Sequence, residues 1–447
     1  MNELITSLND HMARHLEQMP AFDRCGRVSC INGLVIEVTG LVLPMGHICR
    51  IHLGQHKTAS AEVIAFSKNS VSIMPYDHCT GIAKGMLVSA VNGSGFAKVG
   101  LGLLGRVVDG LGRPIDGKGE VAMEAVVPFH PEPINPLMRR RITKTLDVGV
   151  RAINGLMTIC KGQRMGIFAE AGLGKSVLLG MMTKFAEADI VVVGLIGERG
   201  REVKEFIEEI IGEAGLKKTI VVAAPADNSP LMKVTGANYA TAIAEYFRDL
   251  GKDVLLIVDS ITRYAQAYRQ MSLSGGEMPT AKGYTPSVFS KLSSLIERSG
   301  NGSDETGSIT AFYTVLTDSE EMNDPIAEHV RSLIDGHIIL SRDLAEEGHF
   351  PAINVEKSIS RLMHAVVDEP HHKLTIQLKR LIHAYAKNKD MINIGMYQSG
   401  SDPLVDAALS HWEVIRRYLT QGMEECARME ESLILLQQII KSTGLST

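Results

Sequence analysis

The segment Ala169–Ser176 (AEAGLGKS) combines two glycines, a lysine and a serine in a spacing that suits phosphate chemistry. In a glycine-rich turn that leads into a helix, successive backbone N–H groups form a cradle for anions. Gly172 and Gly174 would let the backbone approach a phosphate closely, and Lys175 would reach the β- and γ-phosphates. The Ser176 hydroxyl would hold Mg²⁺, so the spacing predicts a site for a nucleoside triphosphate. The expected contacts come from Ala171, Gly172, Leu173, Gly174, Lys175, Ser176 and Val177.

The stretches on either side of this loop agree with that interpretation. Met165–Phe168 is a short apolar run that predicts a strand, and the run that starts at Val177 is typical of a helix. The usual pattern begins with glycine, where this chain has Ala169. Glu170 is also unusual, because a carboxylate beside phosphates is unfavourable, so we expect its side chain to turn outward to solvent.

Two acidic groups follow apolar runs further along the chain. Leu255–Asp259 (LLIVD) fits a strand whose terminal carboxylate orients Mg²⁺, usually through water. Gly197–Glu202 (GERGRE) follows another apolar run, and ligands of doubly wound sheets lie at the carboxyl ends of the strands. Glu198 is therefore expected near the phosphate loop, where it would polarise the attacking water. Arg199 and Glu202 would position Glu198 or join the metal shell; the alternative is an exposed charged turn.

Phosphoryl transfer spreads negative charge over the γ-oxygens, and an arginine from a neighbouring subunit commonly stabilises that charge. Arg263, Arg342 and Arg361 all lie near predicted strand ends. Chemistry alone leaves the choice among them open.

The region from about residue 142 to 361 alternates apolar runs with helical stretches. Continuous apolar strands between helices indicate a parallel sheet that is covered on both faces. The expected strands are Ile190–Ile196, Thr219–Ala223, Val254–Val258 and Ser308–Val315.

The rest of the chain has a different pattern on each side of this core. Residues 21–93 contain short β-branched runs between turns, which predict a small β-barrel. Residues 364–447 are predicted to be mostly helical. The phosphate-loop domain is therefore expected to span residues 94–363. Residues 1–20 carry one apolar helical face, which would pack on the chain's own surface or dock a partner. That face consists of Leu4, Ile5, Leu8, Met12 and Leu16.

Length and composition exclude several classes of protein. A chain of 447 residues is long enough for two or three domains, and its net charge of -5 argues against a nucleic-acid binder. No apolar run is long enough to span a bilayer and no signal-peptide pattern is present, so we expect a cytoplasmic protein. The six cysteines form no C-x₂-C pair, which favours reduced thiols over a metal site.

Several longer motifs, in this order, resemble the catalytic subunits of the rotary (F1-like) ATPase superfamily. Within it, the chain is most similar to the type III export ATPases, in particular the flagellar branch. The distinctive pieces are Leu104–Pro114 (LGRVVDGLGRP), Asp147–Gly155 (DVGVRAING), Gly197–Phe206 (GERGREVKEF), Ile243–Asp249 (IAEYFRD), Lys282–Phe289 (KGYTPSVF), Gly307–Leu316 (GSITAFYTVL) and Asp335–Arg342 (DGHIILSR).

The resemblance implies a role for each matching position. Lys175 and Ser176 match the phosphate-loop lysine and the Mg²⁺ hydroxyl, and Asp259 matches the aspartate on the magnesium side. Glu198 falls on the catalytic glutamate, and Arg361 on the arginine finger that acts on a neighbouring subunit. Phe350 lies where the family places an aromatic ring against adenine. Tyr397 and Gln398 fall in the helical-domain segment near the adenine.

The resemblance also implies an architecture and a set of partners. The expected fold is an α/β phosphate-loop core of the RecA/F1 type, with a mostly parallel sheet, an N-terminal β-barrel and a C-terminal helical domain. Members form hexameric rings that hydrolyse ATP with Mg²⁺ and energise delivery or unfolding of flagellar export substrates. They bind a stator-like protein through the N-terminus, a coiled-coil central stalk, the export gate and chaperone–substrate complexes. They are peripheral to the inner membrane, not integral.

Two other functions remain open at this point. One is a virulence injectisome ATPase, which has the same chemistry and different partners. The other is a ring-shaped RNA translocase, which also joins a barrel to this core and would need aromatic residues interleaved with basic ones in the barrel. From Cys25 to Phe96 the only aromatic residues are Phe66, Tyr76 and Phe96, so we expect no nucleic-acid partner.

Overall fold

The computed structural model describes residues 25–54, 57–78, 80–91, 95–317 and 324–444. The chain divides into two compact units. One runs to Gly95 and includes Ser274–Gly276, and the other comprises Phe96–Leu273 and Glu277–Thr447. The apolar face of residues 4–16 lies outside the described residues. No helix in the described part of the chain is both long and apolar enough to cross a membrane.

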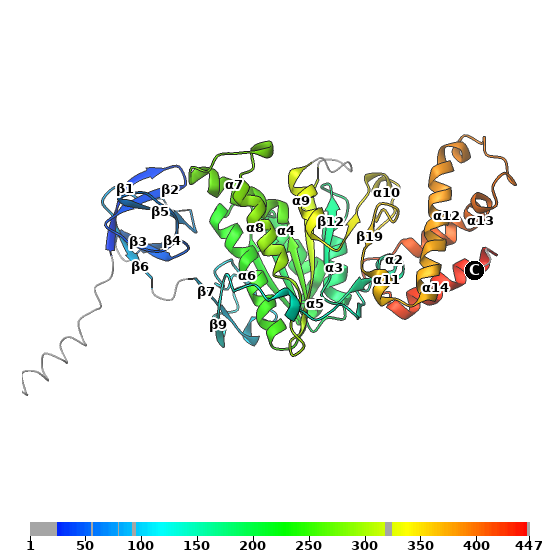
Figure 1. Cartoon of the computed structure of the whole chain (residues 1–447), viewed down its shortest axis with the longest axis horizontal. Helices are drawn as coiled ribbons and strands as arrows, with labels where there is room; N and C mark the ends of the chain where they lie inside the picture. Colours follow the sequence, from blue (N-terminus) through cyan, green and yellow to red (C-terminus); the bar gives the residue numbers. More distant parts are fainter. Residues whose placement is uncertain (1–24, 55–56, 79, 92–94, 318–323, 445–447) are drawn as a thin grey trace, which may run out of the picture. The chain divides into compact units, whose positions relative to one another are not determined.

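The first unit is a closed six-stranded barrel in the order β1-β2-β5-β4-β3-β6 (Figure 1). Side chains of β-strands alternate between two faces, and in β5 Val71 and Ile73 turn inward to a core that also holds Val38, Ile51 and Val88. The predicted barrel is confirmed. Its strands are β1 (Cys25–Asn32), β2 (Val35–Thr39), β3 (Ile48–Gly54), β4 (Lys57–Phe66), β5 (Ser70–Pro75) and β6 (Leu87–Ala90).

The second unit is built on a nine-stranded sheet with helices on both sides (Figure 1). Its path is β19-β18-β12-β17-β15-β13-β14-β8, with β16 paired to β17. All pairs are parallel except those of β16 and β19. The strands are β8 (Val107–Val108), β12 (Arg164–Ala169), β13 (Ile190–Ile196), β14 (Thr219–Ala224), β15 (Asp253–Asp259), β16 (Gly300–Asn301), β17 (Ser308–Leu316), β18 (Gly336–Ile339) and β19 (Ile359–Ser360).

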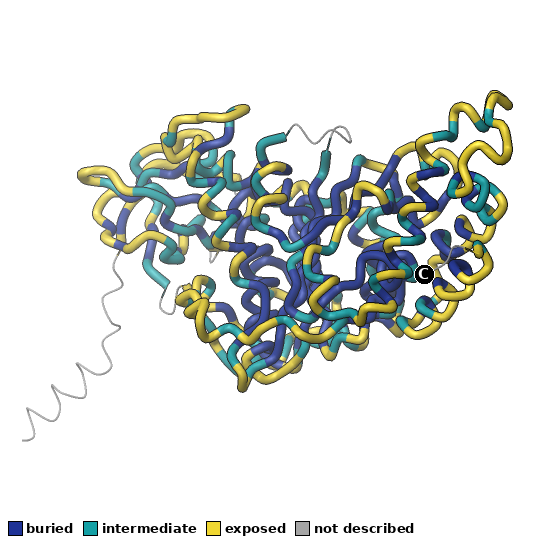
Figure 2. Tube along the Cα trace, turned by 45° about the vertical axis from the view of Figure 1, so that its right-hand side comes forward, coloured by how far each residue is buried: buried dark blue, intermediate teal, exposed yellow. Residues whose placement is uncertain are grey.

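The apolar runs form strands because helices cover both faces of this sheet. Every residue of β13 and β14 is buried, as the continuous runs predicted. Helix α6 (Pro230–Asp249) packs on β13, β14 and β15. The buried stretches of this unit gather in its interior (Figure 2). The other helices of this core are α3 (Lys175–Phe185), α4 (Gly200–Glu205), α5 (Gly212–Leu216), α7 (Ile261–Ser274), α8 (Pro286–Glu297), α9 (Pro325–Leu333), α10 (Arg342–Glu346) and α11 (Met363–Val366).

Parallel pairing brings the carboxyl ends of the central strands to one edge. Phe168 of β12 pairs with Val315 of β17, and Leu195 of β13 pairs with Asp259 of β15. The chain segments that leave β12, β13 and β15 at this edge carry the residues predicted to do chemistry. The edge is where ligands bind in open α/β sheets.

The C-terminal helices pack on the same hydrophobic core as the sheet. They are α12 (Glu369–Asn393), α13 (Pro403–Leu419) and α14 (Met429–Ser442), and they meet α2 (Arg151–Leu156). The Asn154 amide donates to Asp147 Oδ1 at 2.8 Å and to the Ala427 carbonyl at 3.0 Å. Gly155 accepts from His371 and Thr375 of α12. The position expected to begin the helical domain, residue 364, therefore lies within one compact unit.

Short elements complete this unit. β7 (Phe96–Val99) pairs with β9 (Ala125–Pro128), and β10 (Thr145–Leu146) pairs with β11 (Ile159–Cys160). A π-helical turn covers Phe206–Ile211, and 3₁₀ turns cover Leu101–Leu103, Pro136–Met138 and Ala281–Gly283.

Replacing Gly155 with alanine should destabilise the second unit. The added Cβ would overlap the Tyr418 hydroxyl of α13, which itself donates to the Ser432 carbonyl. Extra atoms in a packed core typically cost about 1–3 kcal/mol, so the midpoint of thermal unfolding should fall. The matched control is Gly422→Ala, where the nearest atom, Glu425 Cβ, would lie 3.9 Å away. Equal midpoints for Gly155→Ala and Gly422→Ala would contradict this packing.

Candidate active site

The loop between β12 and α3 has the backbone shape of an anion cradle. Gly172 (φ 84°) and Gly174 (φ 80°) both adopt left-handed conformations, which favour glycine. Gly174 is the N-cap of α3, and the first intrahelical bond runs from Leu178 N to its carbonyl. The amides of the first turn have no acceptor within the helix and remain available to a ligand. The helix dipole adds to their attraction for negative charge.

Lys175 is held between two carboxylates. Its Nζ lies 3.1 Å from Glu198 Oε1 and also contacts Asp259 Oδ1. The side chains are enclosed, with 12% of Lys175, 17% of Glu198 and 4% of Asp259 exposed. Burial opposes the charge of Lys175, but the neighbouring carboxylates outweigh it and raise the pKa of the ammonium group. Lys175 therefore carries its charge and offsets part of the negative charge of the two acids.

Asp259 is fixed at the last residue of β15 by its neighbours. The Thr314 hydroxyl of β17 donates to Asp259 Oδ1 at 2.6 Å. Burial raises the pKa of Asp259, and contact with Lys175 counters that shift. The peptide bond from Asp259 to Ser260 is cis.

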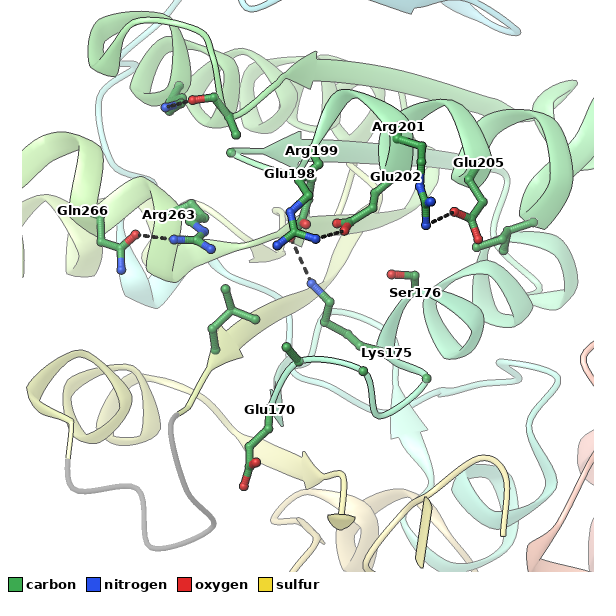
Figure 3. Close-up of a pocket in the computed structure, with 18 of the residues that line it drawn as sticks. Glu170, Lys175, Ser176, Glu198, Arg199, Arg201, Glu202, Glu205, Arg263 and Gln266 are labelled. Atoms are coloured by element: carbon green, nitrogen blue, oxygen red, sulfur yellow. Dashed lines mark hydrogen bonds and ion pairs between the residues drawn. The ribbon is translucent and has the colours of Figure 1, made fainter. Parts of the chain in front are cut away.

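The turn after β13 presents Glu198 toward the loop. Gly197 adopts a left-handed conformation (φ 74°), and the Glu198 carbonyl accepts from Ala226 N at 2.8 Å. Arg199 and Glu202 form an ion pair with each other at 3.4 Å (Figure 3). The side chain of Arg199 is exposed. Glu198 thus faces Lys175, while Arg199 and Glu202 neutralise one another beside it.

A cavity of about 630 Å³ opens between the loop and this turn. Its volume lies in the range that small-molecule ligands occupy. Figure 3 shows Lys175 and Ser176 on one side of it and Glu198 on the other. Lys233 and Arg263 add positive charge to the lining; Arg263 was one of the three candidate arginines, whereas Lys233 was not predicted. Both lie on helices that follow the carboxyl ends of strands, and this position along the sequence is the feature that could have identified them as binding residues.

Glu170 turns away from the cavity, but it is not solvated. Figure 3 shows its side chain directed away from Lys175. Arg342 Nε donates to Glu170 Oε2 at 3.0 Å, and Nη2 contacts the same oxygen. The expected outward orientation is found, and the expected solvent exposure is wrong, because only 15% of the Glu170 side chain is exposed.

Phe350 borders the phosphate loop from the segment after α10. A Cβ placed on Gly174 would lie 3.4 Å from the Phe350 ring. The backbone N–H of Gln421 donates to the Phe350 carbonyl at 2.9 Å. The buried side chain of Gln421 bonds to Gly149 and to the backbone of Arg151. The helical-domain segment beside Phe350 is therefore the connection between α13 and α14.

Tyr397 and Gln398 lie elsewhere, in the connection between α12 and α13. The Tyr397 hydroxyl donates to the carbonyl of Asp402, the N-cap of α13, and to the carboxylate of Asp406 in the first turn of α13. Neither residue lines the cavity, and Phe350 is not among the lining residues either, but the Phe350 ring borders the loop at Gly174. The structure thus does not group them with Phe350, and nothing in the spacing of the sequence distinguished them from Gln421.

Arg361 lies at the opposite end of β12 from the loop. Its backbone N–H donates to the Asp335 carbonyl at 2.9 Å, and Asp335 N donates to the Arg164 carbonyl at the start of β12. At about 3.3 Å per residue, the length of β12 separates that point from the loop by roughly 16 Å. Arg361 is exposed and does not line this cavity.

Family models match most of the chain. Residues 149–360 match the ATP synthase alpha/beta family nucleotide-binding domain, and residues 28–92 match the beta-barrel domain of that family. Residues 367–438 match the T3SS EscN ATPase C-terminal domain.

Curated relatives are similar over nearly the full length. The chain is 51% identical to a flagellum-specific ATP synthase of Pseudomonas aeruginosa over 93% of each protein. It is 49% identical to that of Salmonella typhimurium over 97% of each. A type 3 secretion system ATPase of Xanthomonas euvesicatoria is 42% identical, with 97% of this chain and 98% of the relative covered.

Solved structures show the same architecture. The assembled ATPase EscN of the enteropathogenic Escherichia coli type III secretion system aligns with a TM-score of 0.87 and 41% identity, over 93% of this chain and 100% of EscN. EscN in complex with its central stalk EscO aligns with a TM-score of 0.86 and the same identity and coverage. The loop, the barrel and the helical region together place this chain in the ATP synthase alpha/beta family, in the group of flagellum-specific ATP synthases and type III secretion ATPases.

Proposed function

We propose that this protein hydrolyses Mg²⁺-bound ATP in a homohexameric ring and that hydrolysis energises delivery or unfolding of substrates for flagellar type III export. The observation that carries the chemistry is Lys175, which contacts both Glu198 and Asp259 at the phosphate loop. Lys175 and Glu198 line a cavity together with Gly172 and Gly174 of the anion cradle, and Asp259 contacts Lys175 without lining the cavity itself. That arrangement suits a triphosphate better than a neutral ligand.

In this proposal Lys175 changes partners when nucleotide binds. The β- and γ-phosphates offer its ammonium group more negative charge than the two carboxylates do. Movement of Lys175 to the phosphates would free Glu198 and Asp259. Glu198 would then hold the attacking water by a hydrogen bond and accept its proton. The ion pair of Arg199 with Glu202 would keep the turn in place.

The oxygen donors near the loop fit Mg²⁺. This ion prefers oxygen ligands and often binds through one or two carboxylates together with substrate phosphates. The Ser176 hydroxyl and the Asp259 carboxylate would hold it, with Glu202 as an outer contributor. Bound Mg²⁺ would supply positive charge that offsets the charge of the phosphates.

The location of Arg361 supports a shared site. It lies beyond the length of β12 from its own phosphate loop, so it would act on a neighbouring subunit as the arginine finger. EscN, which shares the fold, is described as assembled. Phe350 would stack on adenine, with the connection that holds Gln421 behind it. Tyr397 and Gln398 are less suited to that role because they lie just before α13, where the Tyr397 hydroxyl bonds to Asp402 and Asp406.

The comparisons favour the flagellar role over the injectisome role. Identity is 51% and 49% to the flagellum-specific relatives above and 42% to the type 3 secretion relative. We also propose a coiled-coil central stalk as a partner, by analogy with EscN and EscO. A stator-like protein on residues 1–20, the export gate, chaperone–substrate complexes and a cytoplasmic position at the inner membrane complete the proposal.

Lys175→Ala should reduce ATP hydrolysis by about 100-fold or more, because no other cation on α3 would reach the β- and γ-phosphates. Phosphate release by the purified protein measures this. Lys184→Ala is the matched control, since Lys184 lies on the same helix and pairs with Glu424. Turnover that survives Lys175→Ala would show that the loop is not the working site.

Glu198→Gln should retain nucleotide binding and lose about 100-fold or more of the hydrolysis rate, because an amide cannot accept the proton. Equilibrium binding and turnover are measured on the same preparation. Glu208→Gln serves as the control, because Glu208 pairs with Lys204 outside the cavity. A near-normal rate for Glu198→Gln would remove Glu198 from the proposed chemistry.

Subunit mixing tests the shared site. Arg361→Ala and Lys175→Ala should each be inactive alone, and a mixture of the two should regain activity. In mixed rings, some interfaces join an intact Lys175 to an intact Arg361. Arg417→Ala, which changes an exposed arginine of α13, should remain active and is the control. If the mixture stays inactive at concentrations where mass measurements show oligomers, Arg361 does not act on its neighbour.

A further inference from the structure

The ion pair between Glu170 and Arg342 has no part in the chemistry described so far. Glu170 belongs to the phosphate loop and is one of the residues that line the cavity. A carboxylate in this position would repel a triphosphate if its side chain turned inward. In the structure it turns outward, and both Nε and Nη2 of Arg342 meet its Oε2 atom.

The pairing is set by the register of two parallel strands. Phe168 of β12 pairs with Ile339 of β18, and Leu340 N donates to the Phe168 carbonyl at 2.9 Å. Beyond these residues, the segments that follow β12 and β18 leave the sheet at the same edge. Glu170 lies two residues beyond Phe168, and Arg342 lies two residues beyond Leu340. The strands therefore bring this acid and this base together.

The segment that carries Arg342 is well anchored. Ser341 N donates to the Ala352 carbonyl at 2.9 Å, and His349 N donates to the Leu344 carbonyl at 2.9 Å. The guanidinium of Arg342 is charged at any ordinary pH, and its hydrogen bond with Glu170 raises its pKa further. Arg342 therefore offers a positive charge outside the cavity that attracts the Glu170 carboxylate.

We propose that Arg342 is a positioning residue for nucleotide binding: it holds the Glu170 carboxylate outside the phosphate site and so keeps a like charge away from the triphosphate. The inference rests on the proposed function, because it requires that the loop bind nucleotide. It also explains how this chain accommodates glutamate within a phosphate loop. Arg342 acts only through Glu170 and does not touch the ligand.

The test measures equilibrium binding of ADP, AMP and a non-hydrolysable ATP analogue, each with Mg²⁺, to the full chain at fixed salt. Arg342→Gln should weaken binding of the ATP analogue by about three- to tenfold, since the freed carboxylate is one charge near a partly solvated ligand. The loss should be smaller for ADP and absent for AMP. Adding Glu170→Gln to Arg342→Gln should restore affinity to the level of the intact protein.

Control variants distinguish the loss of this ion pair from misfolding and from failure of the proposed function. Lys389→Gln breaks a comparable exposed pair, with Glu347 at the end of α10, and should bind as the intact protein does. Thermal unfolding checks that Arg342→Gln folds normally. If the intact protein binds no better than Lys175→Ala, the proposed function itself fails.

Any one of three results would overturn the inference alone while Lys175→Ala still abolishes binding. The first is unchanged affinity of Arg342→Gln for the ATP analogue. The second is a double variant that stays as weak as Arg342→Gln, which would mean that Arg342 contacts the phosphates directly. The third is an equal loss for AMP and the ATP analogue, because charge repulsion depends on the phosphates present.

Discussion

The contact of one ammonium group with two carboxylates at the edge of a buried sheet governs the site. Lys175, Glu198 and Asp259 come from three separate segments, and little of any of them reaches solvent. A charged group so enclosed is unfavourable unless it is paired. The mutual pairing stabilises these charges within one chain, and a polyanionic ligand can take over the cation. The same electrostatic requirement that stabilises the free protein thus prepares it to bind phosphate.

The parallel sheet holds the side chains of this charged cluster in defined positions. Because β12, β13, β15 and β17 are parallel and buried on both faces, their carboxyl ends meet at one edge in a fixed register. Asp259 is held by the Thr314 hydroxyl from the next strand, and Glu198 by a backbone bond to Ala226. Side chains anchored to paired strands hold their positions better than side chains on free loops.

Some of the proposed machinery lies too far from the cavity to serve it within one chain. Arg361 is tied to the start of β12, whereas the loop follows the end of that strand. The geometry therefore favours an enzyme completed by a neighbour. The C-terminal helices, in contrast, contact the core and the Phe350 segment of their own chain. They share the core of the sheet through α2, and Gln421 supports the backbone of Phe350 directly.

The sequence by itself determined the phosphate loop, the buried strands and the acids at their ends. These features depend on local spacing: glycines at left-handed positions, apolar runs, and carboxylates one or two residues beyond them. The tertiary structure alone decided which distant residues meet. Glu170 pairs with Arg342, 172 positions along the chain, and Gln421 rather than Tyr397 or Gln398 reaches Phe350. Such contacts depend on strand order and register and on how helices pack against the sheet, and no local pattern encodes them.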